Sequence, residues 1–177
     1  ALGVAQAIEE TTGLTAQIKW PNDIVVHRKK VCGILTEMSI TPEMDEIQFV
    51  VAGVGVNTNH NSVEDFPEEI RETATSLKIE SGKHIDRAGL LERILARFEE
   101  NYDIFVTTGD LSALRKAYQA HLINMDAQVR VLDPAGEYTG TARGITETGE
   151  LIVERETGES VLVYAGEVSV RGLYGYV

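Results

Sequence analysis

The chain has 177 residues, of which 43% are hydrophobic and 25% charged, a balance typical of a folded globular protein. Its 28 acidic and 16 basic residues give a net charge of −12 at pH 7, so the surface as a whole repels nucleic acid phosphates. This disfavours a general DNA- or RNA-binding role for these residues. No apolar stretch approaches the ~20 residues that a membrane span needs, and no signal peptide is visible.

The single cysteine, Cys32, rules out an intramolecular disulfide. It lies inside an apolar run over residues 31–35, which predicts a small buried side chain rather than a reactive thiol. A chain with one buried thiol fits the reducing cytoplasm. We therefore expect a cytoplasmic protein that has no membrane partner.

The first elements are predicted to be one helix and two short strands. Residues 1–12 have the apolar spacing of an amphipathic helix, which Gly13 ends. The helical pattern starts at the first residue without a capping side chain or a methionine, so we expect the sequence to begin inside an element of a longer protein. Short strands are expected at 18–20 and 24–27, on either side of a turn at 21–23.

A hairpin and a long apolar strand are predicted next. Residues 31–38 are expected to pair with the strand at 24–27 across a charged turn at 28–30. Residues 47–56 are rich in valine and largely apolar, which predicts a strand that is covered on both faces.

Helices and then short strands are expected in the rest of the chain. Asp86 is a capping residue before a helix whose apolar residues lie along one face, and a further helix is expected at about 111–122. After residue 125, five short strand-like runs alternate with turns, which predicts a small β-barrel. The predicted domains are therefore residues 1–125 and residues 126–177.

The first group of residues that could carry chemistry runs from Lys19 to Gly33. Asn22 and Asp23 place an amide and a carboxylate on a tight turn at the end of one strand. Lys30 follows on the next turn, where its ammonium group suits phosphate or carboxylate oxygens. Gly33 removes a side chain from one face of the returning strand, as occurs where a ligand approaches the backbone. Spacing alone nevertheless favours a solvated surface hairpin over a binding site.

The second group is the string Gly-Val-Gly-Val-Asn at residues 53–57. Gly53 and Gly55 alternate, so they lie on one face of the predicted strand and leave a groove, and Asn57 offers a donor and an acceptor. The string is neither a dinucleotide fingerprint nor a P-loop, because the further glycines and the lysine of those motifs are missing. Taken alone, it is better explained by small residues that pack under a helix. The four histidines have no ligand spacing, so no metal site is expected.

Together, these strings resemble the biotin protein ligase family, also called biotin–[acetyl-CoA-carboxylase] ligases. The most specific match is Lys-Trp-Pro-Asn-Asp at residues 19–23, followed by Lys30 and by Gly-Ile-Leu at residues 33–35. Residues 53–57 and the string Ala-Thr-Ser-Leu at residues 74–77 match the family's next two landmarks in order. The end of the chain is similar to the family's SH3-like C-terminal domain.

The resemblance implies both a fold and a reaction. The fold is α+β: a partial class II aminoacyl-tRNA-synthetase-like catalytic domain with a mixed sheet and helices, followed by a small SH3-like β-barrel. In the implied reaction, biotin attacks the α-phosphate of ATP, with Mg²⁺ expected, to give biotinyl-5′-AMP. A lysine amine of the biotin carboxyl carrier protein of acetyl-CoA carboxylase then takes the biotinyl group, and AMP leaves. Whether the chain forms the homodimer common in this family is left open.

Two catalytic residues are implied by the resemblance. Lys30 matches the family's lysine that bridges the biotin carboxyl group and the phosphate, which would neutralise two anions in the first step. It is therefore expected to contribute to catalysis, biotin binding and ATP binding. Asp23 matches the family's aspartate on this turn, and we expect it to receive or orient the carrier lysine in the second step.

Five binding residues are implied in the same way. Gly33, Gly53 and Gly55 match glycines that line the biotin pocket, where missing side chains make room for the fused rings. Asn57 matches an asparagine near the phosphates, and Asn22 is expected to touch the ATP side.

The chain departs from the family pattern in one respect. The family carries an arginine- and glycine-rich loop upstream of this region, which closes over the adenylate, and no such string exists here. The chain alone is therefore expected to hold only part of an active site, and its activity in isolation is in doubt.

Two alternatives stay open. The first is a bifunctional biotin ligase and transcriptional repressor, whose DNA-binding helix-turn-helix would lie outside this chain. The second is a lipoate or octanoyl transferase relative, which shares the catalytic fold. The string at residues 19–23 and the SH3-like end argue against the second alternative.

Overall fold

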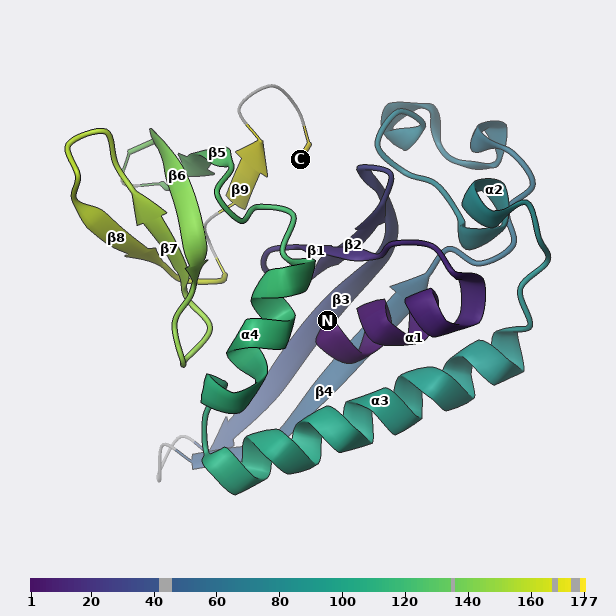
Figure 1. Ribbon diagram of the computed structural model, residues 1–177, viewed down its shortest axis with the longest axis horizontal. Coiled ribbons are helices and arrows are strands. Elements are labelled where there is room, and N and C mark those ends of the chain that lie inside the picture. The colour runs from purple at the N-terminus through teal and green to yellow at the C-terminus, as the bar shows by residue number, and fades with distance from the viewer. Residues whose placement is uncertain (42–45, 135, 167–168, 173–175) are drawn as a thin grey trace.

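The computed structural model describes residues 1–41, 46–134, 136–166, 169–172 and 176–177, and it contains two antiparallel sheets with helices against the first (Figure 1). The first part consists of α1 (Leu2–Thr12), β1 (Gln17–Lys19), β2 (Asp23–Val26), β3 (Lys29–Thr41) and β4 (Glu46–Val56). Next come the 3-10 turns η1 (Val63–Asp65) and η2 (Glu68–Ile70), and the helices α2 (Leu77–Ser81), α3 (Arg87–Thr108) and α4 (Ser112–His121). The second sheet consists of β5 (Gln128–Leu132), β6 (Tyr138–Ile145), β7 (Leu151–Glu154), β8 (Ser160–Val163) and β9 (Ser169–Gly172).

The first sheet has the strand order β1-β2-β3-β4, and α1 packs against both this sheet and α3 (Figure 1). Neighbouring strands are antiparallel, and isolated parallel bridges join Ile18 to Leu122 and Lys30 to Ala74, where Leu122 and Ala74 lie outside the strands. The helix predicted over residues 1–12 is confirmed, and Gly13 ends it in the left-handed conformation with φ 74°. The core of this part includes the buried side chains of Leu2, Ile8, Ile18, Ile24, Val31, Cys32, Leu77 and Leu90.

The remaining helix predictions also hold. Asp86 caps α3, because its carboxylate accepts a hydrogen bond from the amide of Ala88 at 3.0 Å. The helix predicted at about 111–122 is α4. No helix in the described part of the chain is long and apolar enough to cross a membrane.

The second sheet has the strand order β8-β7-β6-β5-β9, and neighbouring strands are antiparallel; the short strands predicted after residue 125 are confirmed. Buried and exposed residues alternate along β5, so Val129 and Val131 point into a small core with Leu151 and Val153. Trp20 and Leu122, from the first part of the chain, belong to the same core. The division at residue 125 therefore stays a prediction, since the second core is shared across it.

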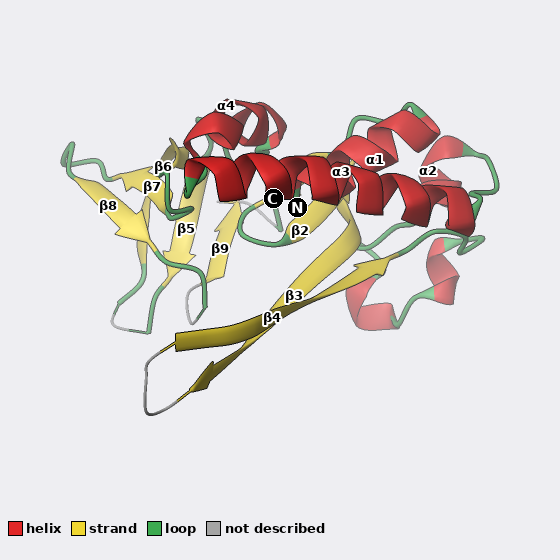
Figure 2. Cartoon of the chain, turned by 90° about the horizontal axis from the view of Figure 1, so that it is seen from below, coloured by secondary structure: helices red, strands yellow, loops and turns green. Residues whose placement is uncertain are grey.

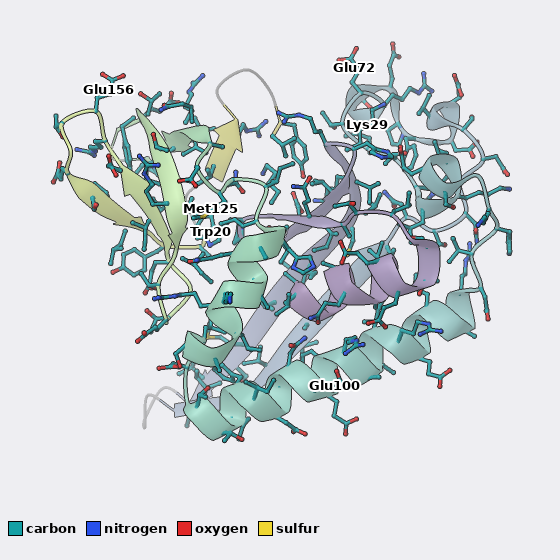
Figure 3. All side chains as sticks on the ribbon, viewed as in Figure 1. Trp20, Lys29, Glu72, Glu100, Met125 and Glu156 are labelled. Carbon is teal, nitrogen blue, oxygen red and sulfur yellow. The ribbon has the colours of Figure 1, made fainter. Side chains whose placement is uncertain are left out.

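Trp20 joins the two parts of the molecule, and it lies at their junction (Figure 3). Its side chain is only 2% exposed, and its indole N–H donates to the carbonyl of Gly149 at 3.0 Å. Its main-chain N–H donates to the side-chain oxygen of Asn124, also at 3.0 Å. The residue that follows, Pro21, has a cis peptide bond. The string Lys-Trp-Pro-Asn-Asp is thus tied to the second sheet as well as to the first.

Replacement of Trp20 by phenylalanine is expected to lower the free energy of unfolding by about 1–3 kcal/mol, because it opens a void and leaves the Gly149 carbonyl without its donor. Urea denaturation measures this change in stability. Unfolding is followed by far-UV circular dichroism rather than by tryptophan fluorescence, because Trp20 is the only tryptophan and the variant lacks it. Tyr164→Phe is the control, because Tyr164 is 62% exposed and should change stability by no more than about 0.5 kcal/mol. Equal stability of the two variants would show that Trp20 does not join the parts.

Two expectations for the hairpin region are wrong. Strand β4 is not covered on both faces, since Phe49, Val50 and Val51 are 57%, 58% and 52% exposed. The valine-rich pattern records apolar character, but burial also needs a neighbouring element on each face. Beyond the helices β3 and β4 continue as a two-stranded ribbon, and no described element covers it (Figure 2). The charged turn is also shorter than residues 28–30: Lys29 and Lys30 belong to β3, and the left-handed residues of the turn are His27 and Arg28.

Candidate active site

One face of the first sheet carries all three glycines that the sequence singled out. Asp23 lies opposite Gly33, and Gly33 lies opposite Gly55, so these three residues form a row across β2, β3 and β4. Directly opposed residues of antiparallel strands share a face, and residues two apart on a strand do so as well. Gly53 therefore lies on the same face, which we call the glycine face. The prediction that Gly53 and Gly55 share a face is confirmed.

A β-bulge brings Lys30 onto the glycine face. Ile24 pairs with Cys32, but the next residue, Val25, pairs with Lys30, so Val31 is an extra residue in β3. In a regular ladder Val25 would face Val31, and Lys30 would point to the opposite side of the sheet with Cys32. Bulges commonly re-aim a side chain beside an active site. Here the bulge places the ammonium group of Lys30 above the glycines.

The side chain of Lys30 lies directly over Gly33. A Cβ atom at Gly33 would be 3.0 Å from both Cε and Nζ of Lys30, which is too close for an ordinary contact. The ammonium group forms an ion pair with Oδ1 of Asp23, whose side chain is only 12% exposed. The main chain of Lys30 is held separately, by hydrogen bonds with Thr73 (2.7 Å) and Thr75 (3.0 Å). The backbone of Lys30 is thus fixed while its ammonium group can exchange partners.

The glycine face forms the floor of an open hollow of about 520 Å³. A Cβ atom at Gly53 would meet only the carbonyl oxygen of Leu35, at 3.7 Å, and one at Gly55 only that of Gly33, at 3.8 Å. Both atoms belong to the adjacent strand, so no side chain of the described residues comes within 4 Å of either added Cβ atom. The hollow is therefore a shelf of bare backbone with a lysine and a carboxylate at one end.

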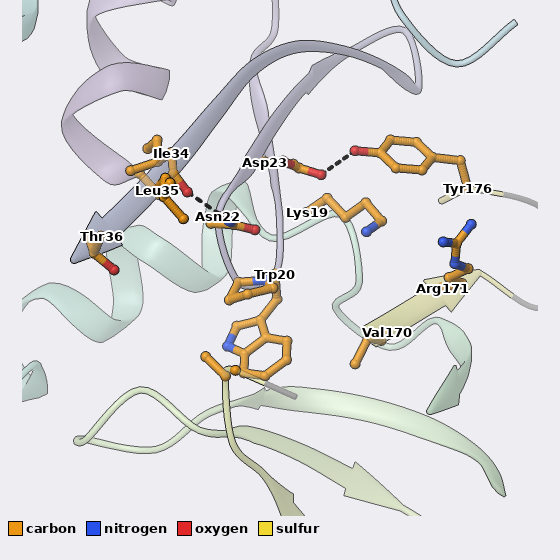
Figure 4. A pocket seen from close by; sticks show the side chains of 14 residues that line it. Lys19, Trp20, Asn22, Asp23, Ile34, Leu35, Thr36, Val170, Arg171 and Tyr176 are labelled. Atoms are coloured by element: carbon orange, nitrogen blue, oxygen red, sulfur yellow. Dashed lines mark hydrogen bonds between the residues drawn. The ribbon is translucent and has the colours of Figure 1, made fainter. Parts of the chain in front are cut away.

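A larger cleft of about 640 Å³ lies between the two sheets and meets the hollow at Asp23 (Figure 4). Lys19, Arg171 and Tyr176 line it on the far side of that carboxylate. Lys19 is 6% exposed, and its ammonium group lies 4.5 Å from the centre of the Tyr176 ring. Burial lowers the pKa of Lys19, while the nearby Asp23 carboxylate opposes that shift.

Asn22 and Asn57 are both engaged with the main chain. The side-chain amide of Asn22 donates to the carbonyl of Ile34 at 2.7 Å, and that of Asn57 donates to the carbonyl of Thr75 at 3.1 Å. Asn22 thereby holds the turn before Asp23, and Asn57 holds the segment that anchors the backbone of Lys30. Their expected roles on the ATP side stay predictions.

Cys32 points away from the glycine face into the first core, where it is 1% exposed. Burial raises the pKa of its thiol to about 12, so the thiol is protonated at neutral pH. The prediction of a buried cysteine is confirmed.

Sequence reasoning missed Tyr176, which the fold brings to Asp23 from 153 residues away. Its hydroxyl donates a hydrogen bond to Oδ2 of Asp23, on the oxygen that Lys30 leaves free. No local pattern near residue 176 announces this contact, because the signal lies in the packing of the second sheet against the first.

Two stretches of the chain match known families. Residues 1–57 match the Biotin/lipoate A/B protein ligase family, and residues 126–171 match the Biotin protein ligase C terminal domain. The structure of the Aquifex aeolicus biotin protein ligase without ligands is 32% identical and superposes with a TM-score of 0.81, over 97% of this chain and 72% of that one. The chain belongs to the biotin protein ligase family. The predicted α+β fold, a partial synthetase-like catalytic domain with an SH3-like C-terminal part, is thereby confirmed.

Curated relatives show how much of a ligase this chain represents. The bifunctional ligase/repressor BirA of Bacillus subtilis is 38% identical over 158 residues, which are 89% of this chain and 47% of the relative. The biotin–[acetyl-CoA-carboxylase] ligase of Mycobacterium tuberculosis is 34% identical over 152 residues, or 85% of this chain and 52% of the relative. The chain thus spans about half the length of these relatives.

Proposed function

We propose that this chain carries the biotin-binding and acceptor side of an ATP-dependent biotin ligase. The enzyme would attach biotin to one lysine of the biotin carboxyl carrier protein of acetyl-CoA carboxylase, through biotinyl-5′-AMP. The observation that carries the proposal is the position of Lys30, which lies over Gly33 at the end of a bare glycine shelf and is paired with Asp23. A related ligase, from Aquifex aeolicus, has been solved with biotin and ATP, which supports the choice of both ligands.

In the first step, an oxygen of the biotin carboxylate forms a bond to the α-phosphorus of ATP, and pyrophosphate leaves. Two anions must approach each other, so a fixed cation lowers the barrier. Lys30 supplies it by turning its ammonium group from Asp23 to the carboxylate and phosphate oxygens. The glycine shelf accepts the fused rings, because Gly53 and Gly55 place no side chain above the sheet.

In the second step, the ε-amine of the carrier lysine attacks the acyl carbon, the acyl–phosphate bond breaks, and AMP leaves. The amine must be neutral and oriented when it attacks. Asp23 accepts its hydrogen bond and its proton, since its carboxylate faces both the hollow and the cleft between the sheets. The cleft is the route by which a carrier domain would present its lysine.

Asn22 and Asn57 border the nucleotide end of the shelf in this proposal, and they hold the backbone there through their amides. Mg²⁺ is expected to arrive with ATP. The described residues contain no group of three His, Cys, Asp or Glu side chains that could hold a metal ion.

The two alternative functions, lipoate transfer and transcriptional repression, have less support than the ligase. The C-terminal match is to the biotin protein ligase domain, which favours biotin over lipoate. The Bacillus subtilis relative is described as a ligase and a repressor, but the net charge of −12 disfavours DNA binding by this chain as a whole. Repression would need the part of the protein outside the matched half. A cytoplasmic location and a homodimer stay predictions.

The direct test is labelling of a carrier domain by the intact ligase that contains this chain, with ATP and either biotin or lipoate. We expect mass spectrometry to detect one biotinyl group on one lysine, only when ATP and biotin are both present. Labelling with lipoate instead of biotin, or ATP-independent labelling, would overturn the proposal.

A further inference from the structure

The two carboxylate oxygens of Asp23 have different donors. Oδ1 is paired with the ammonium group of Lys30, from the same hairpin. Oδ2 accepts a hydrogen bond from the hydroxyl of Tyr176, which follows the last strand of the second sheet. A carboxylate whose side chain is only 12% exposed needs such donors, because burial without them is costly.

The surroundings of Tyr176 hold its hydroxyl in place and protonated. Burial, and then the hydrogen bond to Asp23, raise the pKa of the phenol, so it remains a donor at physiological pH. Its ring is held by the ammonium group of Lys19, 4.5 Å from the ring centre, in the cleft (Figure 4). The next residue, Val177, is also held, because the guanidinium group of Arg28 donates a hydrogen bond to its main-chain oxygen.

The neighbouring backbone is also shaped to admit this segment. A Cβ atom at Gly172 would lie 2.4 Å from the carbonyl carbon of Val177, which no side chain tolerates. Glycine at that position therefore leaves room for the main chain of Val177 beside β9. Lys19 and Asp23 thus hold Tyr176, and Arg28 holds Val177, the residue that follows it.

Lys30 and Tyr176 have different roles in the proposed reaction. In the proposed first step, the ammonium group of Lys30 turns to the reacting anions and releases Oδ1. Of the two side-chain donors to Asp23 among the described residues, the Tyr176 hydroxyl on Oδ2 then remains. That bond fixes the orientation of the carboxyl group at the moment when Oδ1 becomes free.

We propose that Tyr176 is a positioning residue for the transfer step. It holds Asp23 through Oδ2, so that Oδ1 passes from Lys30 to the amine of the carrier lysine. Tyr176 acts only through Asp23, and the second sheet thereby contributes to transfer rather than to formation of the adenylate. This inference rests on the proposed ligase function.

Tyr176→Phe tests the inference, because it removes the hydroxyl and keeps the ring beside Lys19. The two half-reactions are measured separately in the intact ligase: biotin-dependent exchange of labelled pyrophosphate into ATP, and single-turnover transfer from biotinyl-5′-AMP to the carrier domain. We expect the rate of exchange to stay within about twofold of wild type and the rate of transfer to fall about tenfold or more. Transfer slows because Asp23, which accepts the proton of the amine, is no longer held in its orientation. The rate constant for transfer at saturating carrier domain should fall, while the carrier concentration that gives half the maximal rate should stay the same.

Two further variants separate positioning from a structural role. Tyr138→Phe is the matched control, since the ring of Tyr138 lies 4.2 Å from the guanidinium of Arg155 in the second sheet, and neither half-reaction should change. In an Asp23→Asn background, adding Tyr176→Phe should slow transfer no further, because the two residues act as one unit.

Three outcomes decide between the possibilities. Equal loss of exchange and transfer in Tyr176→Phe would mean that the hydroxyl only holds the cleft together, and unchanged transfer would mean that it has no role; either result overturns the inference. A wild-type ligase that performs no biotin-dependent exchange would instead overturn the proposed function on which the inference rests.

Discussion

Lys30→Ala is expected to slow the formation of biotinyl-5′-AMP by about 10²–10³-fold, the usual effect of removing one group that stabilises developing charge. The variant removes the only ammonium group that the bulge in β3 brings over the glycine face among the described residues. Without it, the carboxylate of biotin and the α-phosphate approach each other with no cation between them. The measurement is biotin-dependent pyrophosphate exchange at saturating ATP and biotin.

Lys29→Ala is the matched control for this variant. Lys29 is the adjacent lysine on the same strand and pairs with Val26, so its side chain points to the other side of the sheet. It should exchange pyrophosphate at nearly the wild-type rate. Both variants should fold, because the substitutions leave the main-chain hydrogen bonds of Lys30 with Thr73 and Thr75 in place. Far-UV circular dichroism checks this. Wild-type exchange in a folded Lys30→Ala variant would remove Lys30 from the mechanism.

Gly55→Val is expected to raise the KM for biotin by about 10- to 100-fold while leaving the fold intact. A Cβ atom at this position would meet only the carbonyl oxygen of Gly33, at 3.8 Å, which is an ordinary contact, so the strand itself has room for a β-carbon. Valine also suits a β-strand. The isopropyl group would instead fill the shelf where the fused rings of biotin are proposed to lie.

Ala52→Val adds a similar volume to the same strand on the other face. Ala52 lies opposite Thr36, three residues from Gly55, and it is exposed, so the KM for biotin should be unchanged. Steady-state kinetics at several biotin concentrations compare the two variants. An equal effect of both substitutions would indicate a general disturbance of β4, and no effect of Gly55→Val would place biotin elsewhere.

Local signals in the sequence predicted much of the fold. The helix over residues 1–12, its end at Gly13 and the cap at Asp86 depend on short-range chemistry, so they could be read directly. The exposure of β4 could not be predicted from the sequence, because apolar composition does not say which elements are present to cover a strand. The outer half of the β3–β4 ribbon has no such element in the described part of the chain.

The site shows the same limit at the level of single residues. Residues 30 and 33 have opposite parity, so a regular strand would place Lys30 and Gly33 on opposite faces, and only the bulge at Val31 brings them together. The contact of Tyr176 with Asp23, and that of Trp20 with Gly149, each join residues more than a hundred positions apart. Such contacts depend on how the second sheet docks, which no local pattern records.

The most direct test of the glycine-face site is a structure of the intact ligase with biotin and ATP. We expect the fused rings of biotin over Gly53 and Gly55, with its carboxyl group and the α-phosphate within hydrogen-bond distance of Nζ of Lys30. Biotin bound instead in the cleft between the sheets, beside Arg171 and with the glycine face empty, would contradict the proposed site.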